Sequence, residues 1–276
     1  MNRLLLTLGL VALGGCGATN AQTGGEGTLT GADETATVAQ NLSGNQLLGS
    51  TLKTTGNLNL RSGPATTYAV RTVMPLGAEV TVVDAAPSGG FYNVKYNSLV
   101  GWASGSYLVA SAPSNGLSVA RSAAIERAKS GVGYSYWWGH GAWTPWGVSS
   151  STAGVCTGNC PSCTHSGSWG ADCSGYVGKI WQVPSTNADP RVDSHPYSTS
   201  TFVGSNSQWS TVSRSSLKPG DALVYNVNGA GHIFLYESGD GWGSMWAYEA
   251  KGCAVGIVHD LRTADSNYKG IARSGY

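Results

Sequence analysis

The stretch that decides the fold is Gly170-Ala171-Asp172-Cys173-Ser174-Gly175-Tyr176, in which a helix start coincides with a thiol. Asp172 is a residue type that caps helix N-termini. Apolar residues then follow at the i, i+3, i+4 spacing of one helix face: Val177, Ile180 and Trp181. The pattern predicts a helix over residues 171–182 with Cys173 in its first turn. The positive end of the helix dipole favours thiolate over thiol, whereas the alternative is a structural cysteine that is buried or disulfide-bonded.

A thiolate nucleophile requires a base, and the base requires a residue that orients it. His232 opens the apolar strand expected over residues 232–237, and a second strand is expected over residues 245–250. A two-residue turn at Asp240-Gly241 would place Glu249 directly opposite His232, on the same face of the sheet. The sequence therefore predicts a Cys173–His232–Glu249 constellation. A bulge would shift this register, and both strand residues have the alternative of no role.

The region around these motifs has an α+β pattern. Ser118 is expected to cap a helix that runs through Lys129 and stops at Gly131. After the predicted helix at Cys173, strand-like segments follow over residues 222–227, 232–237, 245–250, 253–258 and 270–275. Helices followed by an antiparallel meander indicate an α+β domain over residues 118–276.

The preceding region is different, because short strands recur over residues 51–110 at intervals of about ten residues without a helix pattern. This spacing predicts a small β-barrel, joined to the second domain by a linker over residues 111–117. The region resembles a bacterial SH3-type domain in Leu58-Asn59-Leu60-Arg61-Ser62-Gly63-Pro64, Gly77 and Gly101-Trp102-Ala103-Ser104. Such modules bind cell-wall polymer or shape the cleft of an attached hydrolase; the alternative is a spacer.

The first residues predict export. Arg3 precedes an apolar run over residues 4–13, which is too short to span a bilayer, so residues 1–21 are predicted to be a signal peptide. Leu13-Gly14-Gly15-Cys16 resembles a lipoprotein box, which predicts lipidation at Cys16; the alternative is cleavage after Ala21 without a lipid. Residues 22–50 are expected to be a flexible tether. The location expected is the cell envelope, in the periplasm or at the outer membrane, or otherwise outside the cell.

The charge balance bears on partners. Sixteen Lys and Arg residues oppose fifteen Asp and Glu, for a net charge of +1. Nucleic-acid binding requires a basic stripe that releases counterions, so this balance argues against nucleic acid as the main partner.

Four motifs occur in the order found in the NlpC-type cell-wall cysteine peptidases: Tyr134-Ser135-Tyr136-Trp137-Trp138-Gly139, Asp172-Cys173-Ser174-Gly175-Tyr176, Leu217-Lys218-Pro219-Gly220-Asp221 and Gly231-His232-Ile233. The resemblance implies a papain-like α+β fold without a cofactor or metal. It also implies hydrolysis of peptidoglycan stem peptides, at a γ-D-glutamyl-diamino acid bond, through a thioester. Cys173 would be the nucleophile, His232 the base and Glu249 the third member of the triad. Three residues would contact substrate: Tyr136, Asp172 and Ser174.

This resemblance leaves other outcomes open. The same Cys–His site would serve an acyltransferase or a toxin-like enzyme, and a relic of the site would leave a non-catalytic wall-binding protein. The chain also departs from the family pattern at Gly139-His140 and in an insertion over residues 141–170. A monomer is expected, with a membrane contact only through the lipid.

The other cysteines predict disulfides, because an exported chain meets an oxidising compartment. Four candidates allow three connectivities, among which the sequence does not choose: Cys156, Cys160, Cys163 and Cys253. The alternative is a zinc site formed by the first three with His165. The remaining histidines have no evident partners in the sequence and are interpreted as surface or structural residues: His140, His165, His195 and His259.

Overall fold

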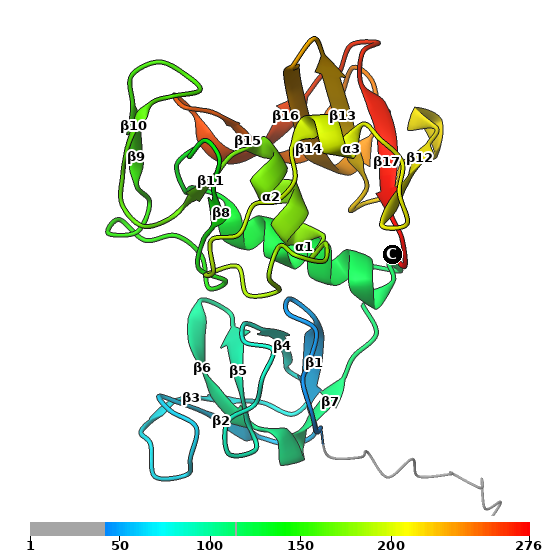
Figure 1. The fold of residues 1–276 in the computed structure, drawn as a ribbon. Helices are drawn as coiled ribbons and strands as arrows, with labels where there is room; N and C mark the ends of the chain where they lie inside the picture. Colours follow the sequence, from blue (N-terminus) through cyan, green and yellow to red (C-terminus); the bar gives the residue numbers. More distant parts are fainter. Residues whose placement is uncertain (1–41, 114) are drawn as a thin grey trace, which may run out of the picture. The chain divides into compact units, whose positions relative to one another are not determined.

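The computed structural model describes residues 42–113 and 115–276 (Figure 1). The predicted signal peptide, Cys16 and the tether up to residue 41 lie outside these residues. Within the described part of the chain, no helix is long and apolar enough to cross a membrane.

The first domain is a seven-stranded antiparallel sheet in the order β3-β2-β6-β5-β4-β1-β7. Its strands are β1 (Thr51–Thr54), β2 (Leu58–Arg61), β3 (Val70–Met74), β4 (Glu79–Val82), β5 (Phe91–Tyr96), β6 (Leu99–Ser104) and β7 (Leu108–Ala110). A 3-10 turn, Gly105–Tyr107, precedes β7. Alternate side chains turn inward, as the polar–apolar alternation of Leu58-Asn59-Leu60-Arg61 predicts, and form a core that includes Leu52, Leu60, Val80, Tyr92 and Val94.

The last part of the predicted tether is folded against this domain. The backbone N–H of Gln46 donates to Ala85 O, and the backbone N–H of Gly49 donates to Val82 O, each at a distance of 2.9 Å. Leu48 is only 5% exposed, and its carbonyl accepts a hydrogen bond from Arg127 Nη1 at 2.6 Å. The expectation of a flexible tether is therefore wrong for residues 42–50, because they bury apolar surface and satisfy their backbone groups in protein.

The second domain combines three helices with a six-stranded sheet. The helices are α1 (Val119–Gly131), α2 (Cys173–Ile180) and α3 (Thr199–Phe202). Ser118 caps α1 by accepting from Arg121 N, and Asp172 caps α2 by accepting from Gly175 N. Both predicted caps are confirmed, and α2 is shorter than expected at its end.

The large sheet has the order β12-β17-β13-β14-β15-β16 and is antiparallel throughout. Its strands are β12 (Trp209–Val212), β13 (Ala222–Val227), β14 (Ala230–Gly239), β15 (Met245–Gly252), β16 (Gly256–Arg262) and β17 (Lys269–Arg273). A 3-10 turn, Arg214–Ser216, lies between β12 and β13. The expected meander holds for β13 to β16. The sequence did not predict β12, and the final strand returns to pair with β13 instead of extending the meander.

Two short strand pairs lie in the insertion: β8 (Gly141–Ala142) with β11 (Gly170–Ala171), and β9 (Val155–Thr157) with β10 (Thr164–Ser166). Disulfides join Cys156 to Cys163 and Cys160 to Cys253. The structure thus selects one of the three connectivities and ties the β9–β10 hairpin to the turn between β15 and β16. The zinc alternative is not formed, because its sulfurs are in these bridges and His165 Nε2 lies 2.7 Å from Ser135 Oγ.

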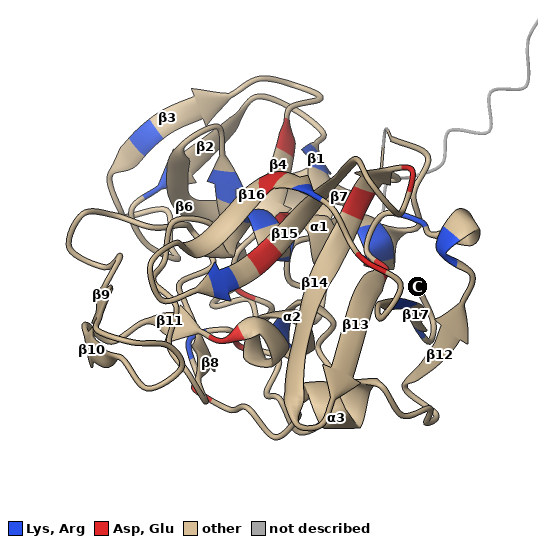
Figure 2. Ribbon diagram, turned by 90° about the horizontal axis from the view of Figure 1, so that it is seen from above, with Lys and Arg blue, Asp and Glu red and all other residues tan. Residues whose placement is uncertain are grey.

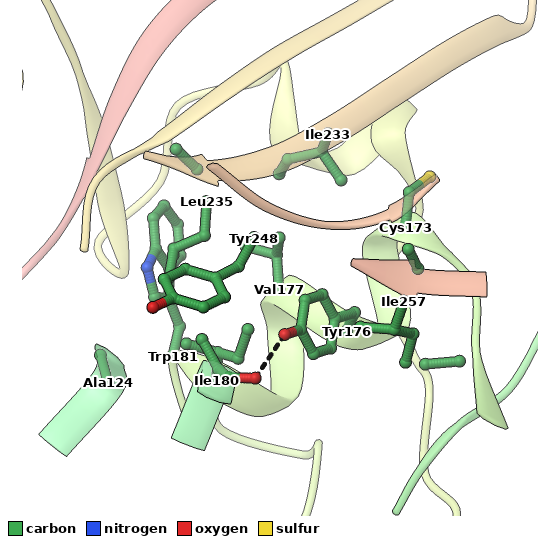
Figure 3. Close-up of a cluster of buried hydrophobic side chains, with 14 of the residues drawn as sticks. Ala124, Cys173, Tyr176, Val177, Ile180, Trp181, Ile233, Leu235, Tyr248 and Ile257 are labelled. Atoms are coloured by element: carbon green, nitrogen blue, oxygen red, sulfur yellow. Dashed lines mark hydrogen bonds between the residues drawn. The ribbon is translucent and has the colours of Figure 1, made fainter. Parts of the chain in front are cut away.

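Helix α2 is the centre of the core of this domain (Figure 3). All of its residues are buried, and its apolar side chains meet Ile233, Leu235, Tyr248 and Ile257 of the sheet. Tyr176 donates from its hydroxyl to Ala128 O of α1 at 2.6 Å. A Cβ on Gly175 would lie 2.3 Å from His140 O, so the glycine allows a close backbone approach that any larger residue would prevent.

Acidic and basic positions are interspersed over the strands instead of gathering by sign (Figure 2). The net charge of the chain is +1.

Candidate active site

Cys173 occupies the first position of α2 and is 8% exposed. Cys173 is the one cysteine among the described residues that forms no disulfide. The backbone N–H of Ile233 donates to its sulfur, which brings the start of α2 against β14 at the residue that follows His232. Tertiary packing thus joins two motifs that lie far apart along the chain.

Burial raises the pKa of the Cys173 thiol to about 12, and the negative charge of Asp172 acts in the same direction. Hydrogen bonds from the backbone N–H groups of Ile233 and Ser174 only partly oppose this rise. The expectation that the helix start would favour the thiolate is therefore wrong for the resting molecule. The physical reason is that desolvation of a buried sulfur outweighs the dipole of a short helix. The Cys173 thiol therefore carries its proton at neutral pH.

The predicted base, His232, and its predicted partner, Glu249, are in contact. His232 Nε2 lies 2.8 Å from Glu249 Oε2, and Glu249 is completely buried. Two further cations approach the carboxylate at 3.7 Å: Lys251 Nζ and Arg262 Nε. Burial alone would raise the pKa of Glu249, but the hydrogen bond with His232 and the charges of Arg262 and Lys251 hold it below its ordinary value. The carboxylate is thus ionised at neutral pH and able to orient the imidazole.

The predicted register between these strands is wrong in detail. The pairs run Leu235↔Tyr248 and Tyr236↔Ala247, and a bulge follows Tyr236. The same register, extended along β14 toward His232, pairs Phe234 with Glu249. His232 lies two residues before Phe234, so the side chains of His232 and Glu249 are on the same face of the sheet as diagonal neighbours. The turn is a loop over residues 240–244, in which Asp240 Oδ1 accepts backbone N–H groups, and the bulge shifts the pairing.

A cavity of about 440 Å³ opens beside the thiol. Three predicted substrate contacts line it with Cys173: Tyr136, Asp172 and Ser174. Burial, with the nearby Cys173 and Asp172 charges, raises the pKa of Tyr136 above its ordinary value, so its hydroxyl keeps its proton and remains a donor. Ser174 Oγ donates to Asp172 Oδ1 at 3.0 Å.

The sequence interpretation missed His195, which also lines this cavity. Its Nε2 lies 2.9 Å from Asp172 Oδ2 and 3.4 Å from Ser174 Oγ. Asp172 also accepts from the backbone N–H groups of Gly175 and Gly139. Burial alone would raise the pKa of Asp172, but the His195 interaction and these N–H groups lower it. No local pattern marks His195, because it lies in an irregular segment between α2 and α3.

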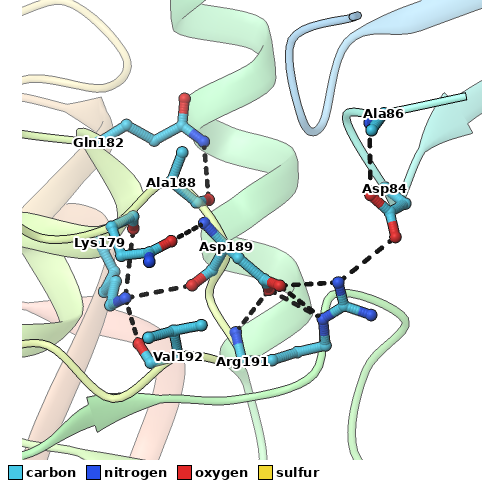
Figure 4. Close-up of polar contacts among 9 residues, drawn as sticks. Asp84, Ala86, Lys179, Gln182, Ala188, Asp189, Arg191 and Val192 are labelled. Atoms are coloured by element: carbon cyan, nitrogen blue, oxygen red, sulfur yellow. Dashed lines mark hydrogen bonds and ion pairs between the residues drawn. The ribbon is translucent and has the colours of Figure 1, made fainter.

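That segment is anchored to the helix that carries the thiol (Figure 4). Lys179 Nζ, from α2, donates hydrogen bonds to Asn187 O and Asp189 O, each at a distance of 3.2 Å. Burial lowers the pKa of Lys179 to about 8, although the negative charges of Asp189 and Asp193 act to raise it. The anchor fixes the segment just before His195.

The other histidines have partners that the sequence did not reveal, which agrees with their interpretation as surface or structural residues. His140 Nδ1 contacts Asp193 Oδ2 at 2.5 Å, and His259 Nε2 contacts Glu237 Oε2 at 2.8 Å. The rings of His140 and His165 both stack on Trp137. None of these histidines lines the cavity at Cys173.

Comparisons with known proteins bear on the first domain. A family model described as Bacterial SH3 domain matches residues 56–109. These residues form a bacterial SH3 domain. A search of curated proteins finds no match.

Among solved structures, the chain is similar to two proteins from Trichomonas vaginalis. NlpC2 is 14% identical, with 82% of this chain and 71% of that one covered and a TM-score of 0.35. NlpC1 is 15% identical, with 80% and 70% covered and a TM-score of 0.33. Likenesses at this level decide nothing about the domain that follows the bacterial SH3 domain, whose interpretation rests on its own geometry.

Proposed function

We propose that the chain is a cysteine endopeptidase of papain-like fold that hydrolyses peptide bonds in peptidoglycan stem peptides. The observation that carries this proposal is the buried Cys173 thiol at the start of α2, held against β14 beside a His232–Glu249 pair. A thiol, an imidazole and an orienting carboxylate are the parts of a nucleophilic acyl-transfer site. The order of motifs noted in the sequence supports the γ-D-glutamyl-diamino acid bond as the target.

The reaction begins with proton transfer from Cys173 to His232, because the thiol is protonated at rest. The sulfur attacks the scissile carbonyl carbon, and backbone N–H groups at the start of α2 stabilise the oxyanion. His232 then gives the proton to the leaving amine as the C–N bond breaks, which leaves a thioester. Water, deprotonated by His232, hydrolyses that thioester and restores the thiol.

The bacterial SH3 domain supports action at a cell wall, either by binding the polymer or by shaping the cleft. A lipid on Cys16 would hold a monomeric enzyme at the membrane surface, within the cell envelope.

The test is digestion of purified sacculi, with released peptides identified by mass spectrometry. Cys173→Ala and His232→Ala should abolish release, because each removes a reacting group. His259→Ala is the matched control, since His259 forms a similar pair with Glu237 but lies on β16, whereas His232 directly precedes Ile233, whose backbone contacts the Cys173 sulfur. Release by Cys173→Ala at the parent rate would refute the proposal. Products joined to an added amine, instead of free acids, would identify an acyltransferase.

A further inference from the structure

The Asp172 carboxylate is fully occupied by hydrogen bonds from its own protein. Its Oδ1 accepts from Ser174 Oγ at 3.0 Å and from the backbone N–H of Gly175 at 2.8 Å. Its Oδ2 accepts from the backbone N–H of Gly139 at 2.9 Å and lies 2.9 Å from His195 Nε2. A carboxylate offers about four lone-pair sites, and these contacts use all of them. A substrate group therefore cannot bind Asp172 without displacing one of these partners.

His195 presents a different polar atom beside that carboxylate. Because Asp172 is ionised and can only accept, the hydrogen of their contact belongs to His195 Nε2, and Nδ1 of the neutral ring is an acceptor. Nδ1 has no hydrogen-bond partner among the described residues, yet it is not one of the buried atoms that lack accessible surface. The side chain is 9% exposed and lines the cavity at Cys173. A nearly buried imidazole thus keeps one nitrogen open for a ligand.

The segment that carries His195 is fixed by the loop before α2. Asp193 Oδ1 accepts from the backbone N–H of Gly141 at 3.0 Å, and Asp193 Oδ2 lies 2.5 Å from His140 Nδ1. The carbonyl of His140 in turn accepts from the backbone N–H of Asp172 at 3.0 Å. The imidazole of His195 is therefore positioned by the same loop that leads into the nucleophile, so its use in binding costs little additional ordering.

The charge of this cavity limits what it can hold. Among the described residues that line it, none is Lys or Arg, and Asp172 is the one carboxylate. Its far wall offers neutral polar groups, which include the hydroxyls of Ser198 and Ser200 and the amide of Asn226. A carboxylate from a ligand would find no cation to pair with here and would lie near the negative charge of Asp172. An uncharged group that carries an N–H donor is the better fit.

We propose that His195 is a specificity-determining residue that selects a γ-D-glutamyl residue whose α-carboxyl group is amidated. In a γ-linked glutamyl residue the side-chain carbonyl belongs to the scissile bond, so the α-carboxyl group is left pendant near it. As a carboxamide, this group donates an N–H to His195 Nδ1 while the scissile carbonyl lies at Cys173. As a carboxylate, it meets the lone pair of Nδ1 and the charge of Asp172. The choice of a γ-linked peptide rests on the proposed function.

The test measures binding to the full chain carrying Cys173→Ala, so that no peptide is cleaved. Isothermal titration calorimetry compares L-alanyl-γ-D-glutamyl-L-lysine with the same tripeptide carrying an α-carboxamide on its glutamyl residue. The carboxamide peptide should bind at least about tenfold more tightly than the carboxylate peptide. Equal affinities, tighter binding of the carboxylate peptide, or no binding of the carboxamide peptide would overturn the proposal.

Substitution of His195 then assigns the preference to its imidazole. In the Cys173→Ala background, His195→Ala should weaken binding of the carboxamide peptide by about tenfold without weakening binding of the carboxylate peptide. His195→Gln keeps an N–H for Asp172 and a carbonyl acceptor, so it should retain part of the preference and remains informative if the alanine variant fails to fold. His259→Ala is the matched control, because this histidine pairs with Glu237 at 2.8 Å but, unlike His195, does not line the cavity. An unchanged preference in His195→Ala would overturn the role of His195.

Hydrolysis by the parent enzyme separates this inference from the proposed function. The value of kcat/KM for the carboxamide peptide should exceed that for the carboxylate peptide by at least about tenfold. Cleavage of both peptides with equal kcat/KM would overturn the specificity and leave the proposed hydrolase standing. Cleavage of neither peptide, with the preference in binding intact, would refute the proposed hydrolysis and leave the recognition of the carboxamide by His195 standing.

Discussion

Replacement of Glu249 by glutamine tests whether the buried carboxylate is a net stabilising charge. Glutamine retains an acceptor for His232 but not the charge, and a charged hydrogen bond is worth about 1 kcal/mol more than a neutral one. Lys251 and Arg262, whose side chains are 32% and 22% exposed, each add roughly half a kcal/mol. After the opposing cost of burying the charge, we expect a loss of about 1.5 kcal/mol, or a Tm lower by roughly 3–6 °C.

The pH dependence follows from the lowered pKa of Glu249. An ionised carboxylate with a depressed folded-state pKa contributes stability above its unfolded pKa, and this contribution disappears as the pH falls through the folded value. The difference in Tm between parent and Glu249→Gln should therefore be constant above about pH 5 and close at lower pH. Differential scanning calorimetry between neutral and acidic pH measures both quantities.

Glu237→Gln is the matched control, because Glu237 pairs with His259 at 2.8 Å but is 27% exposed. Solvent screens that pair, so its loss should cost less than about 1 kcal/mol. A Glu249→Gln variant as stable as the parent, or a difference in Tm that persists unchanged into acid, would refute the reasoning.

Three further outcomes are expected. The rate at which iodoacetamide alkylates Cys173 can be followed by peptide mapping. This rate should rise about tenfold per pH unit between roughly pH 7 and pH 10, because the thiol has a pKa of about 12. A rate that does not change with pH would contradict this expectation. Joint replacement of Cys160 and Cys253 by serine removes a cross-link between residues 93 positions apart. The free energy of unfolding measured in urea should fall by about 4 kcal/mol, and a fall of less than about 1 kcal/mol would contradict this expectation. Ser118→Ala removes the cap of α1 and should cost about 1 kcal/mol; an unchanged Tm would show that the cap contributes nothing.

The sequence by itself determined the features that depend on near neighbours. Ser118 and Asp172 cap the helices that follow them, because a cap requires only a side-chain oxygen and an N–H three residues on. The strand over residues 222–227 and the repeated short strands of the bacterial SH3 domain follow from alternation and turn residues, which are also local. The assignment of Cys173 to the first turn of a helix follows in the same way.

Only the tertiary structure decided the features that depend on packing between distant segments. The bulge after Tyr236 shifts the pairing, so His232 meets Glu249 diagonally, and no local signal specifies that shift. His195 reaches Asp172 from an irregular segment, and one disulfide pairing is selected because folding brings particular sulfurs together. The pKa of Cys173 is raised, against the expectation from the helix start, because solvent exclusion depends on everything that surrounds the sulfur and not on its neighbours along the chain.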